Sequence, residues 1–210
     1  MNAEKTYENV MKVMNRESIE SKVLPRMRSS KELINVKERN NVYFEFLDMV
    51  ETFYVPLDAG DEERLVITEA IINKVGMTSK ELLQAAKRNI DKCWQIKSLS
   101  ELMSELTGMP APASEMDVPL FVATTNNRSH GASVFLSDSL MKAASGKFGG
   151  EVIILPSSVH EILLMPKSDD FKYENLLEIV HMVNRTEVSE EDFLSNNIYV
   201  YKDGNFQIIA

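Results

Sequence analysis

The run Ser157-Ser158-Val159-His160-Glu161 contains the side-chain types that nucleophilic catalysis uses. A serine nucleophile needs a general base within hydrogen-bond reach and an acid that orients the base. The spacing argues against a triad here, because known triads draw their members from distant parts of a fold and the Gly-x-Ser-x-Gly elbow is absent. Two serines after Pro156 are also typical of a connection between strands. We therefore interpret the run as a turn, and a hydrolase that uses His160 is the alternative.

A metal site would have to combine His130, His160 and His181 with acids such as Glu161. The histidines are thirty and twenty-one residues apart, which matches no compact ligand motif. Gly149-Gly150 resembles a phosphate loop only in part, because these glycines precede a predicted strand and lack the lysine and helix of that motif. The sequence therefore predicts no metal and no other cofactor, and a metal-dependent enzyme using His160 is a second form of the alternative.

Two polar turns interrupt the apolar runs in this part of the chain, one from Asn126 to His130 and one from Ser157 to Glu161. We expect both turns to lie at one edge of the fold, where they form a contact surface for a protein or a small molecule. The candidate surface comprises Asn126, His130, Ser157, Ser158, His160 and Glu161.

Acidic side chains outnumber basic ones, and the net charge of the chain is −9. Residues 1–40 are net +3 and residues 71–100 net +4, whereas 41–70 and 151–210 are each net −7. A nucleic-acid binder needs a dense basic face that replaces counterions on phosphates. Neither basic block is dense enough, so the charge pattern does not favour nucleic-acid binding.

The length of 210 residues, with 44% hydrophobic and 26% charged residues, is typical of a globular protein with a packed core. The single cysteine, Cys93, lies in a helical-looking segment and cannot form an internal disulfide, so we interpret it as a small core residue. Met1–Met14 lacks the apolar stretch of a signal peptide, and no run approaches the roughly 20 apolar residues of a membrane span. We therefore expect a cytoplasmic protein with no membrane partner.

Cap and turn signals predict several elements. Thr78-Ser79-Lys80-Glu81 has the spacing of a capping box, followed by an apolar helical face. Asp203-Gly204 between two β-rich runs indicates a hairpin. Further helices are expected over Tyr7–Met14, from Thr68 to Gly76, over Ser98–Leu106, and after Ser137, Asp169 or Asp170, and Ser189.

The order strand, turn, strand and helix is expected twice, over Leu120–Ala144 and over Val152–Val183. Short turns join neighbouring strands, so these strands should pair antiparallel. The predicted fold class is α+β, a mainly antiparallel sheet with helices packed on one face and strand–strand–helix units in the second half.

The proline-containing segment 109–117 is the candidate boundary along the chain. It would separate a helix-rich half, 1–108, which also holds one or more strands, from an α+β half, 118–210. Alternatively, the chain is a single domain in which 109–117 is an internal loop.

Several short motifs resemble a bacterial family whose members are known only as a domain of unknown function, mainly in Gram-positive anaerobes. The matching segments are Pro119–Asn126, Gly131-Ala132, Leu155–Glu161 and Phe193–Tyr201, with Asn41, the region around Phe53 and Leu82–Asn89 upstream. The order of elements is also faintly similar to YtpQ-like proteins of unknown function. The resemblance implies a bacterial protein and transfers no activity. From the residues themselves we expect a non-enzymatic binding or regulatory module.

Overall fold

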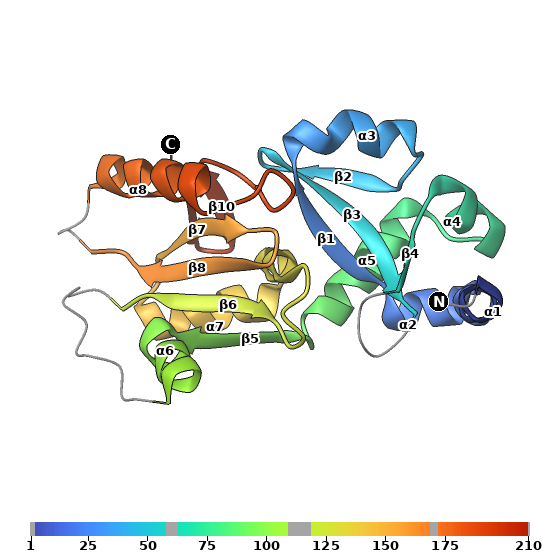
Figure 1. Ribbon diagram of the computed structural model, residues 1–210, viewed down its shortest axis with the longest axis horizontal. Helices are drawn as coiled ribbons and strands as arrows, with labels where there is room; N and C mark the ends of the chain where they lie inside the picture. The colour runs from blue at the N-terminus through green and yellow to red at the C-terminus, as the bar shows by residue number, and fades with distance from the viewer. Residues whose placement is uncertain (1–2, 58–62, 109–118, 169–171, 210) are drawn as a thin grey trace. The chain divides into compact units, whose positions relative to one another are not determined.

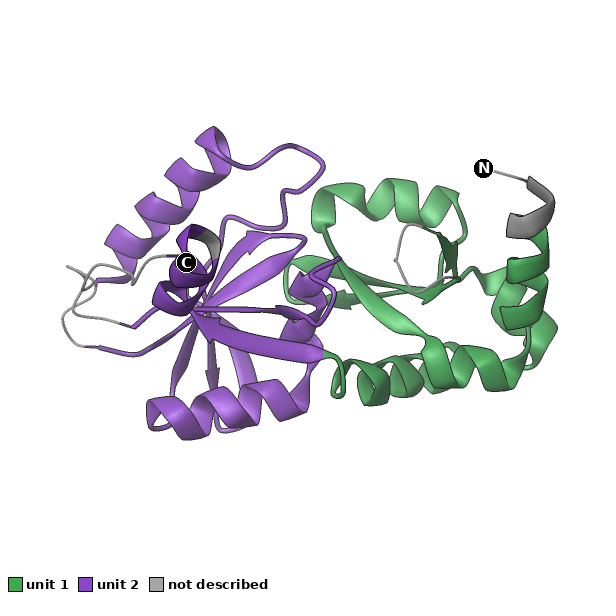
Figure 2. Ribbon diagram, turned by 60° about the horizontal axis from the view of Figure 1, so that its bottom comes forward, with its two compact units in different colours: residues 1–93 green, residues 94–210 purple. Residues whose placement is uncertain are grey.

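The computed structural model describes residues 3–57, 63–108, 119–168 and 172–209. The chain divides into two compact units, residues 1–93 and residues 94–210 (Figure 2). The segment 109–117, the boundary candidate from the sequence, lies outside the described residues. Within those residues the strands form one antiparallel sheet in each unit, which confirms the α+β class.

The first unit is built on a four-stranded sheet in which β3 is central. β1 pairs with one edge of β3, and β2 and β4 pair with successive parts of its other edge. Its elements are α1 (Ala3–Val13), α2 (Arg16–Lys22), β1 (Leu24–Ser29), η1 (Ser30–Glu32), α3 (Leu33–Glu38), β2 (Tyr43–Phe46), β3 (Met49–Pro56), β4 (Arg64–Val66), α4 (Glu69–Val75) and α5 (Ser79–Ile90) (Figure 1).

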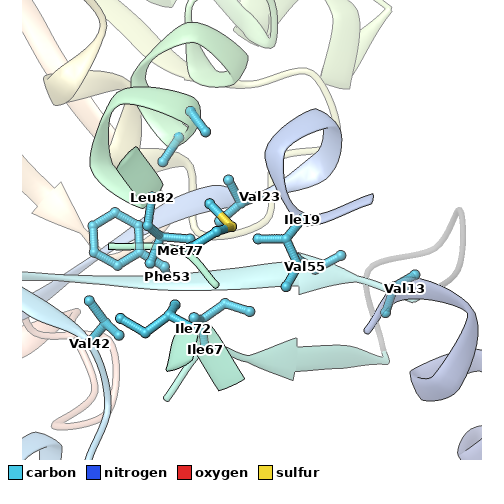
Figure 3. Close-up of a cluster of buried hydrophobic side chains, with 12 residues drawn as sticks. Val13, Ile19, Val23, Val42, Phe53, Val55, Ile67, Ile72, Met77 and Leu82 are labelled. Carbon is cyan, nitrogen blue, oxygen red and sulfur yellow. The ribbon is translucent and has the colours of Figure 1, made fainter. Parts of the chain in front are cut away.

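The core of this unit lies between one face of the sheet and helices α2, α4 and α5 (Figure 3). Phe53 and Val55, two residues apart on β3, point to the same face and pack with Leu82 of α5. Phe44 on β2 meets the Phe53 ring edge-on, with centroids 6.0 Å apart. Burying side chains of this size contributes about 1.5–3 kcal/mol each, so this face holds the helices in place.

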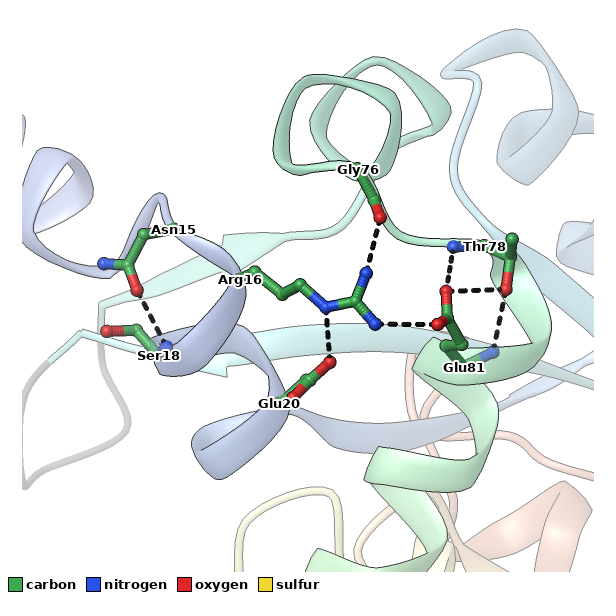
Figure 4. Close-up of polar contacts among 7 residues, drawn as sticks. All are labelled: Asn15, Arg16, Ser18, Glu20, Gly76, Thr78 and Glu81. Atoms are coloured by element: carbon green, nitrogen blue, oxygen red, sulfur yellow. Dashed lines mark hydrogen bonds and ion pairs between the residues drawn. The ribbon is translucent and has the colours of Figure 1, made fainter.

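The predicted capping box is confirmed at the start of α5 (Figure 4). The Thr78 hydroxyl accepts from the Glu81 amide, and the Glu81 carboxylate accepts from the Thr78 amide at 2.8 Å. Arg16 of α2 donates to Glu81 at 2.7 Å and to the Gly76 carbonyl at 2.6 Å. The Thr78 amide and the Arg16 guanidinium together lower the pKa of Glu81 to about 2. These contacts join α2 to the turn between α4 and α5.

The second unit is a six-stranded antiparallel sheet in the order β10-β9-β7-β8-β6-β5. Its elements are β5 (Trp94–Ser98), α6 (Leu99–Thr107), β6 (Phe121–Thr125), η2 (Gly131–Leu136), α7 (Asp138–Phe148), β7 (Val152–Ser158), β8 (Glu161–Pro166), α8 (Tyr173–Thr186), β9 (Tyr199–Lys202) and β10 (Asn205–Ile208). The Asp203-Gly204 hairpin is confirmed, and both turn residues adopt the positive φ values of a type I′ turn, 50° and 80°.

Helices cover both faces of this sheet, whereas the sequence led us to expect them on one face. Leu176 and Val180 of α8 pack on Ile153 and Leu155 of β7. The intervening strand residues, such as Ile154, are equally buried on the opposite face, where α7 packs. The sequences of these strands are therefore nearly continuous runs of apolar residues.

Two local predictions are wrong. Residues 131–136 form the 3₁₀ helix η2, whereas a second strand was expected there. The cause is a contact between segments that are distant in the sequence. A Cβ at Gly131 would overlap Thr124 and the His160 carbonyl, so only glycine lets the chain pass so close to the β7–β8 turn. After Ser189 the chain forms a turn and no helix, although the cap-like bond from the Asp192 amide to the Ser189 hydroxyl is present at 3.2 Å. The predicted helix start at 169–170 lies outside the described residues.

Candidate functional site

Three turns of the second unit are bonded together beside the β7–β8 hairpin. They are the turn after β6 (126–130), the β7–β8 turn (159–160) and the turn 189–192. The Thr124 hydroxyl donates to the His160 carbonyl at 2.8 Å, and the Val159 amide donates to the Asp192 carbonyl at 2.9 Å. The two turns singled out from the sequence are thus joined, and the third brings in a carboxylate.

Both ring nitrogens of His160 are engaged. Nδ1 accepts from the backbone amide of His130 at 3.4 Å, and Nε2 lies 3.2 Å from Oδ1 of Asp192. Because Nδ1 is an acceptor, the neutral ring carries its proton on Nε2, which donates to Asp192. The ring also stacks on His130, with centroids 5.7 Å apart and an angle of 16° between the planes. The ring is therefore fixed in position and in tautomer.

The serines bond to other partners. Ser157 Oγ donates to the Glu161 carboxylate at 3.3 Å, and Ser158 Oγ accepts from the His160 amide at 3.0 Å. Among the described residues, then, the serine bonds go to a carboxylate and to the backbone, and the ring bonds go to Asp192 and to the backbone. This arrangement has no serine–histidine relay, which is what the hydrolase alternative requires.

The turn after β6 is held in an unusual backbone conformation. Arg128 and His130 have positive φ, 60° and 47°, a region that residues with a Cβ seldom occupy. The Thr125 hydroxyl bonds to Asn127 Oδ1 at 2.8 Å and to the Ser129 carbonyl at 3.0 Å. These bonds keep the turn folded, so its tip presents a fixed shape.

Exposure separates the candidate residues into two roles. His130 is only 5% exposed, and its ring stacks on the inner face of the His160 ring. The side chains of His160 and Asp192 are 44% and 43% exposed, and Asn126, the first residue after β6, is exposed. We call the accessible set the three-turn surface: Asn126, Ser157, Ser158, His160, Glu161 and Asp192.

Sequence reasoning missed Asp192. The signal was present, because Ser189 and Asp192 have cap spacing, but it was interpreted as a helix start only. Asp192 uses Oδ2 for the Ser189 hydroxyl, at 2.9 Å, and Oδ1 for His160. His181, the third histidine of the metal hypothesis, is exposed on α8. In the part of the chain that the structure describes, no group of three metal-ligating side chains is close enough to hold an ion.

A family model described as a family of unknown function, DUF5688, matches residues 2–203. The chain belongs to this family. Searches of curated proteins and of solved structures found no match. The match covers residues of both units.

Membership in DUF5688 assigns no role to any residue, so the chemistry follows from geometry alone. Among the described helices, none combines the length and the apolar character that a bilayer span needs. The three-turn surface offers carboxylate, amide and hydroxyl acceptors on a rigid frame. Such a surface can bind a donor-rich partner.

Proposed function

We propose that this DUF5688 member is a cytoplasmic bacterial protein that acts as a non-enzymatic binding or regulatory module through the three-turn surface. The observation that carries the proposal is the state of His160. Both of its ring nitrogens are engaged, yet the side chain is 44% exposed. A general base needs a free nitrogen facing its substrate, whereas a binding surface needs exposed groups in a fixed geometry.

The rigidity of the three turns supports binding. Loops that are already ordered lose little conformational entropy when a partner docks. Here the turns are bonded to one another through Thr124, Val159 and the His160–Asp192 pair. The partner therefore meets a surface that does not need to be ordered on binding.

The chemistry of the surface indicates the partner. Glu161 and Asp192 carry negative charge, and residues 151–210 as a whole are net −7. Asn126 adds an exposed amide at the start of the first turn. A protein segment or small molecule that carries positive charge and hydrogen-bond donors fits this surface.

The test begins with co-purification from the native cell, and the recovered partner is then titrated in purified form. The double variant Asn126→Ala/Glu161→Ala removes one amide and one carboxylate of the surface, at the cost of the long Ser157–Glu161 bond of 3.3 Å, and we expect at least tenfold weaker binding. Gln207→Ala, exposed on the β9–β10 hairpin, is the control and should bind like the wild type. Equal affinity of the double variant and the wild type would exclude the three-turn surface.

The hydrolase alternative has its own readout. His160→Ala should leave any ester or peptide hydrolysis by the preparation unchanged, because the ring bonds that the described residues make go to the His130 amide and to Asp192. Hydrolysis that is present in the wild type and lost in both His160→Ala and Ser158→Ala would replace the binding proposal with the enzyme.

A further inference from the structure

Three arginines share one face of the sheet in the first unit. Side chains two residues apart on a strand point to the same face, so Arg26 and Arg28 of β1 lie together. Arg26 is opposite Thr52 of β3, and Arg64 of β4 is opposite Pro56. Because positions 52 and 56 of β3 point the same way, Arg64 joins the other two. This face is opposite the one that carries Phe53 and the helices of the core. We call it the arginine face.

The positive charge of Arg26 is only partly balanced by acidic groups and hydrogen bonds on this face. Its Nε is buried and has no hydrogen-bond partner among the described residues. Burial, followed by the charges of Arg28 and Arg64, lowers the pKa of Arg26 to about 10, and Glu32 opposes the shift. Placing like charges together in a half-buried setting costs free energy. In a chain of net charge −9, this concentration of positive charge needs an explanation.

A small pocket lies where the arginine face meets η1 and α3. Its volume is about 50 Å³. On the same measure one water needs roughly 10–15 Å³, so the pocket has room for one small oxyanion. The residues that line it are Arg28, Glu32, Asn35, Val36, Arg39 and Asn41. The lining is therefore rich in side chains that donate hydrogen bonds.

The donors of the pocket come from a rigid frame. Arg28 is held by a hydrogen bond from Nε to the Thr52 hydroxyl at 3.1 Å and by an ion pair with Glu32, and its side chain is only 12% exposed. Asn41 is 7% exposed and its backbone bridges to Thr68. A guanidinium in a fixed orientation is the side chain best suited to recognise a phosphate.

The charges define the ligand. Arg28 and Arg39 line the pocket, and Arg26 is coupled electrostatically to Arg28 and to Glu32. Two guanidinium groups and one carboxylate line the pocket, which leaves one positive charge. Arg26 lies outside the lining and adds to the positive field there, so the pocket favours an anion, and the forked donors of its arginines suit a phosphate group.

We propose that this pocket binds a phosphate group, either as the free ion or as part of a phosphorylated small molecule. The site belongs to the first unit and is independent of the three-turn surface in the second. The pocket matches the size of the anionic group only, so an organic part of the ligand would remain outside it.

The direct test is calorimetric titration of the full chain with inorganic phosphate at pH 8, with ionic strength held constant by chloride. We expect saturable binding at one site. Arg39→Gln, an exposed substitution, should weaken it about tenfold, as loss of one charge-assisted hydrogen bond does. Arg88→Gln on the exposed side of α5 is the matched control and should leave the affinity unchanged. No saturation by about 10 mM phosphate, or equal weakening in both variants, would overturn the proposal.

A second variant separates binding from structure. Arg26→Gln should unfold at a higher temperature than the wild type in phosphate-free buffer, because it relieves the crowding of charge, and phosphate should stabilise it less than it stabilises the wild type. If Arg26 is purely structural, the variant unfolds at a lower temperature and responds to phosphate like the wild type, which would contradict the proposal.

The source of the phosphate is read from a third titration, with glycerol phosphate. Binding at least as tight as that of inorganic phosphate supports a phosphorylated small molecule. Binding of inorganic phosphate alone supports the free ion. Both outcomes support phosphate binding in the pocket, and they distinguish the free ion from a phosphorylated small molecule as its ligand.

Discussion

A single buried carboxylate in the first unit makes its stability depend on pH. Glu51 of β3 is 3% exposed, and its Oε1 has no hydrogen-bond partner among the described residues. Burial raises its pKa from 4.5 to about 7, against a smaller opposing effect of Lys87. Between these two values the folded state keeps a proton that the unfolded state has lost. Stability should therefore fall as pH rises from 4.5 to 7.

Substitution Glu51→Gln removes this dependence. A pKa difference of about 2.5 between the folded and unfolded states corresponds to about 3 kcal/mol, so the variant should be more stable than the wild type by up to that amount at pH 8. At pH 5 most of the difference should disappear, because the wild-type carboxyl is then protonated when folded. Urea unfolding at the two pH values measures it. A difference that is the same at both would show that Glu51 is ionised, or solvated, in the folded protein.

At the scale of elements, the cap of α5 is the most local contribution to the first unit. Thr78→Ala removes the hydroxyl that accepts from the Glu81 amide, and we expect a loss of about 1 kcal/mol in the free energy of unfolding. Lys80→Ala, exposed in the same turn, serves as the control and should change stability little. Because the pKa of Glu81 is lowered to about 2, its contribution should be present above pH 4.5 and be lost as pH falls toward 2. If both variants unfold at the same denaturant concentration, the cap does not stabilise the unit.

Two glycines of the second unit should respond in opposite ways to alanine. At Gly131 the new Cβ would overlap Thr124 and the His160 carbonyl, and we expect a loss of about 1–3 kcal/mol or more together with a displaced His160. At Gly146, in the last turn of α7, a Cβ meets no atom within 4 Å, and the substitution should stabilise by up to about 0.5–1 kcal/mol. Thermal unfolding of the two variants tests this. Tolerance of Gly131→Ala would mean that η2 does not pack against the turns as described.

The elements that the sequence predicts well are those set by neighbours along the chain. The box at Thr78 and Glu81 and the turn at Asp203-Gly204 need only local bonds and local φ values. The 3₁₀ helix after His130 was missed because its apolar residues resemble a strand, and only the close approach of Gly131 to the β7–β8 turn decides against one. The cap and the hairpin turn were predicted because their bonds join near neighbours in the sequence. The 3₁₀ helix was missed because it depends on a contact between residues that are far apart in the sequence.

The candidate sites show the same limit. The turns containing His130 and His160 were identified from their polar composition, but the partner of the ring, Asp192, lies thirty-two residues further along. Arg26 and Arg64 are harder still, because they share a face only through their registers with β3. The spacing of residues along the sequence does not predict which residues of two strands lie opposite each other.

For the whole molecule, the two units differ in surface chemistry as well as in fold. The first carries an arginine face with a phosphate-sized pocket, and the second carries the acceptor-rich three-turn surface. The chain is acidic overall, and the pairing of strands adds Arg64 to the two arginines of β1. If both proposals hold, the first unit binds a phosphorylated ligand and the second a donor-rich partner, and neither requires chemistry at His160.

The position of the proton on the His160 ring distinguishes a binding surface from a general base. We predict that long-range ¹H–¹⁵N spectra at pH 8 show a proton on Nε2 and an unprotonated Nδ1, because Nδ1 accepts from the His130 amide. The Nε2 signal should move in Asp192→Asn and stay in place in Gln207→Ala. A proton on Nδ1, with Nε2 unprotonated and free to accept from a substrate, would contradict the account and make His160 available as a general base.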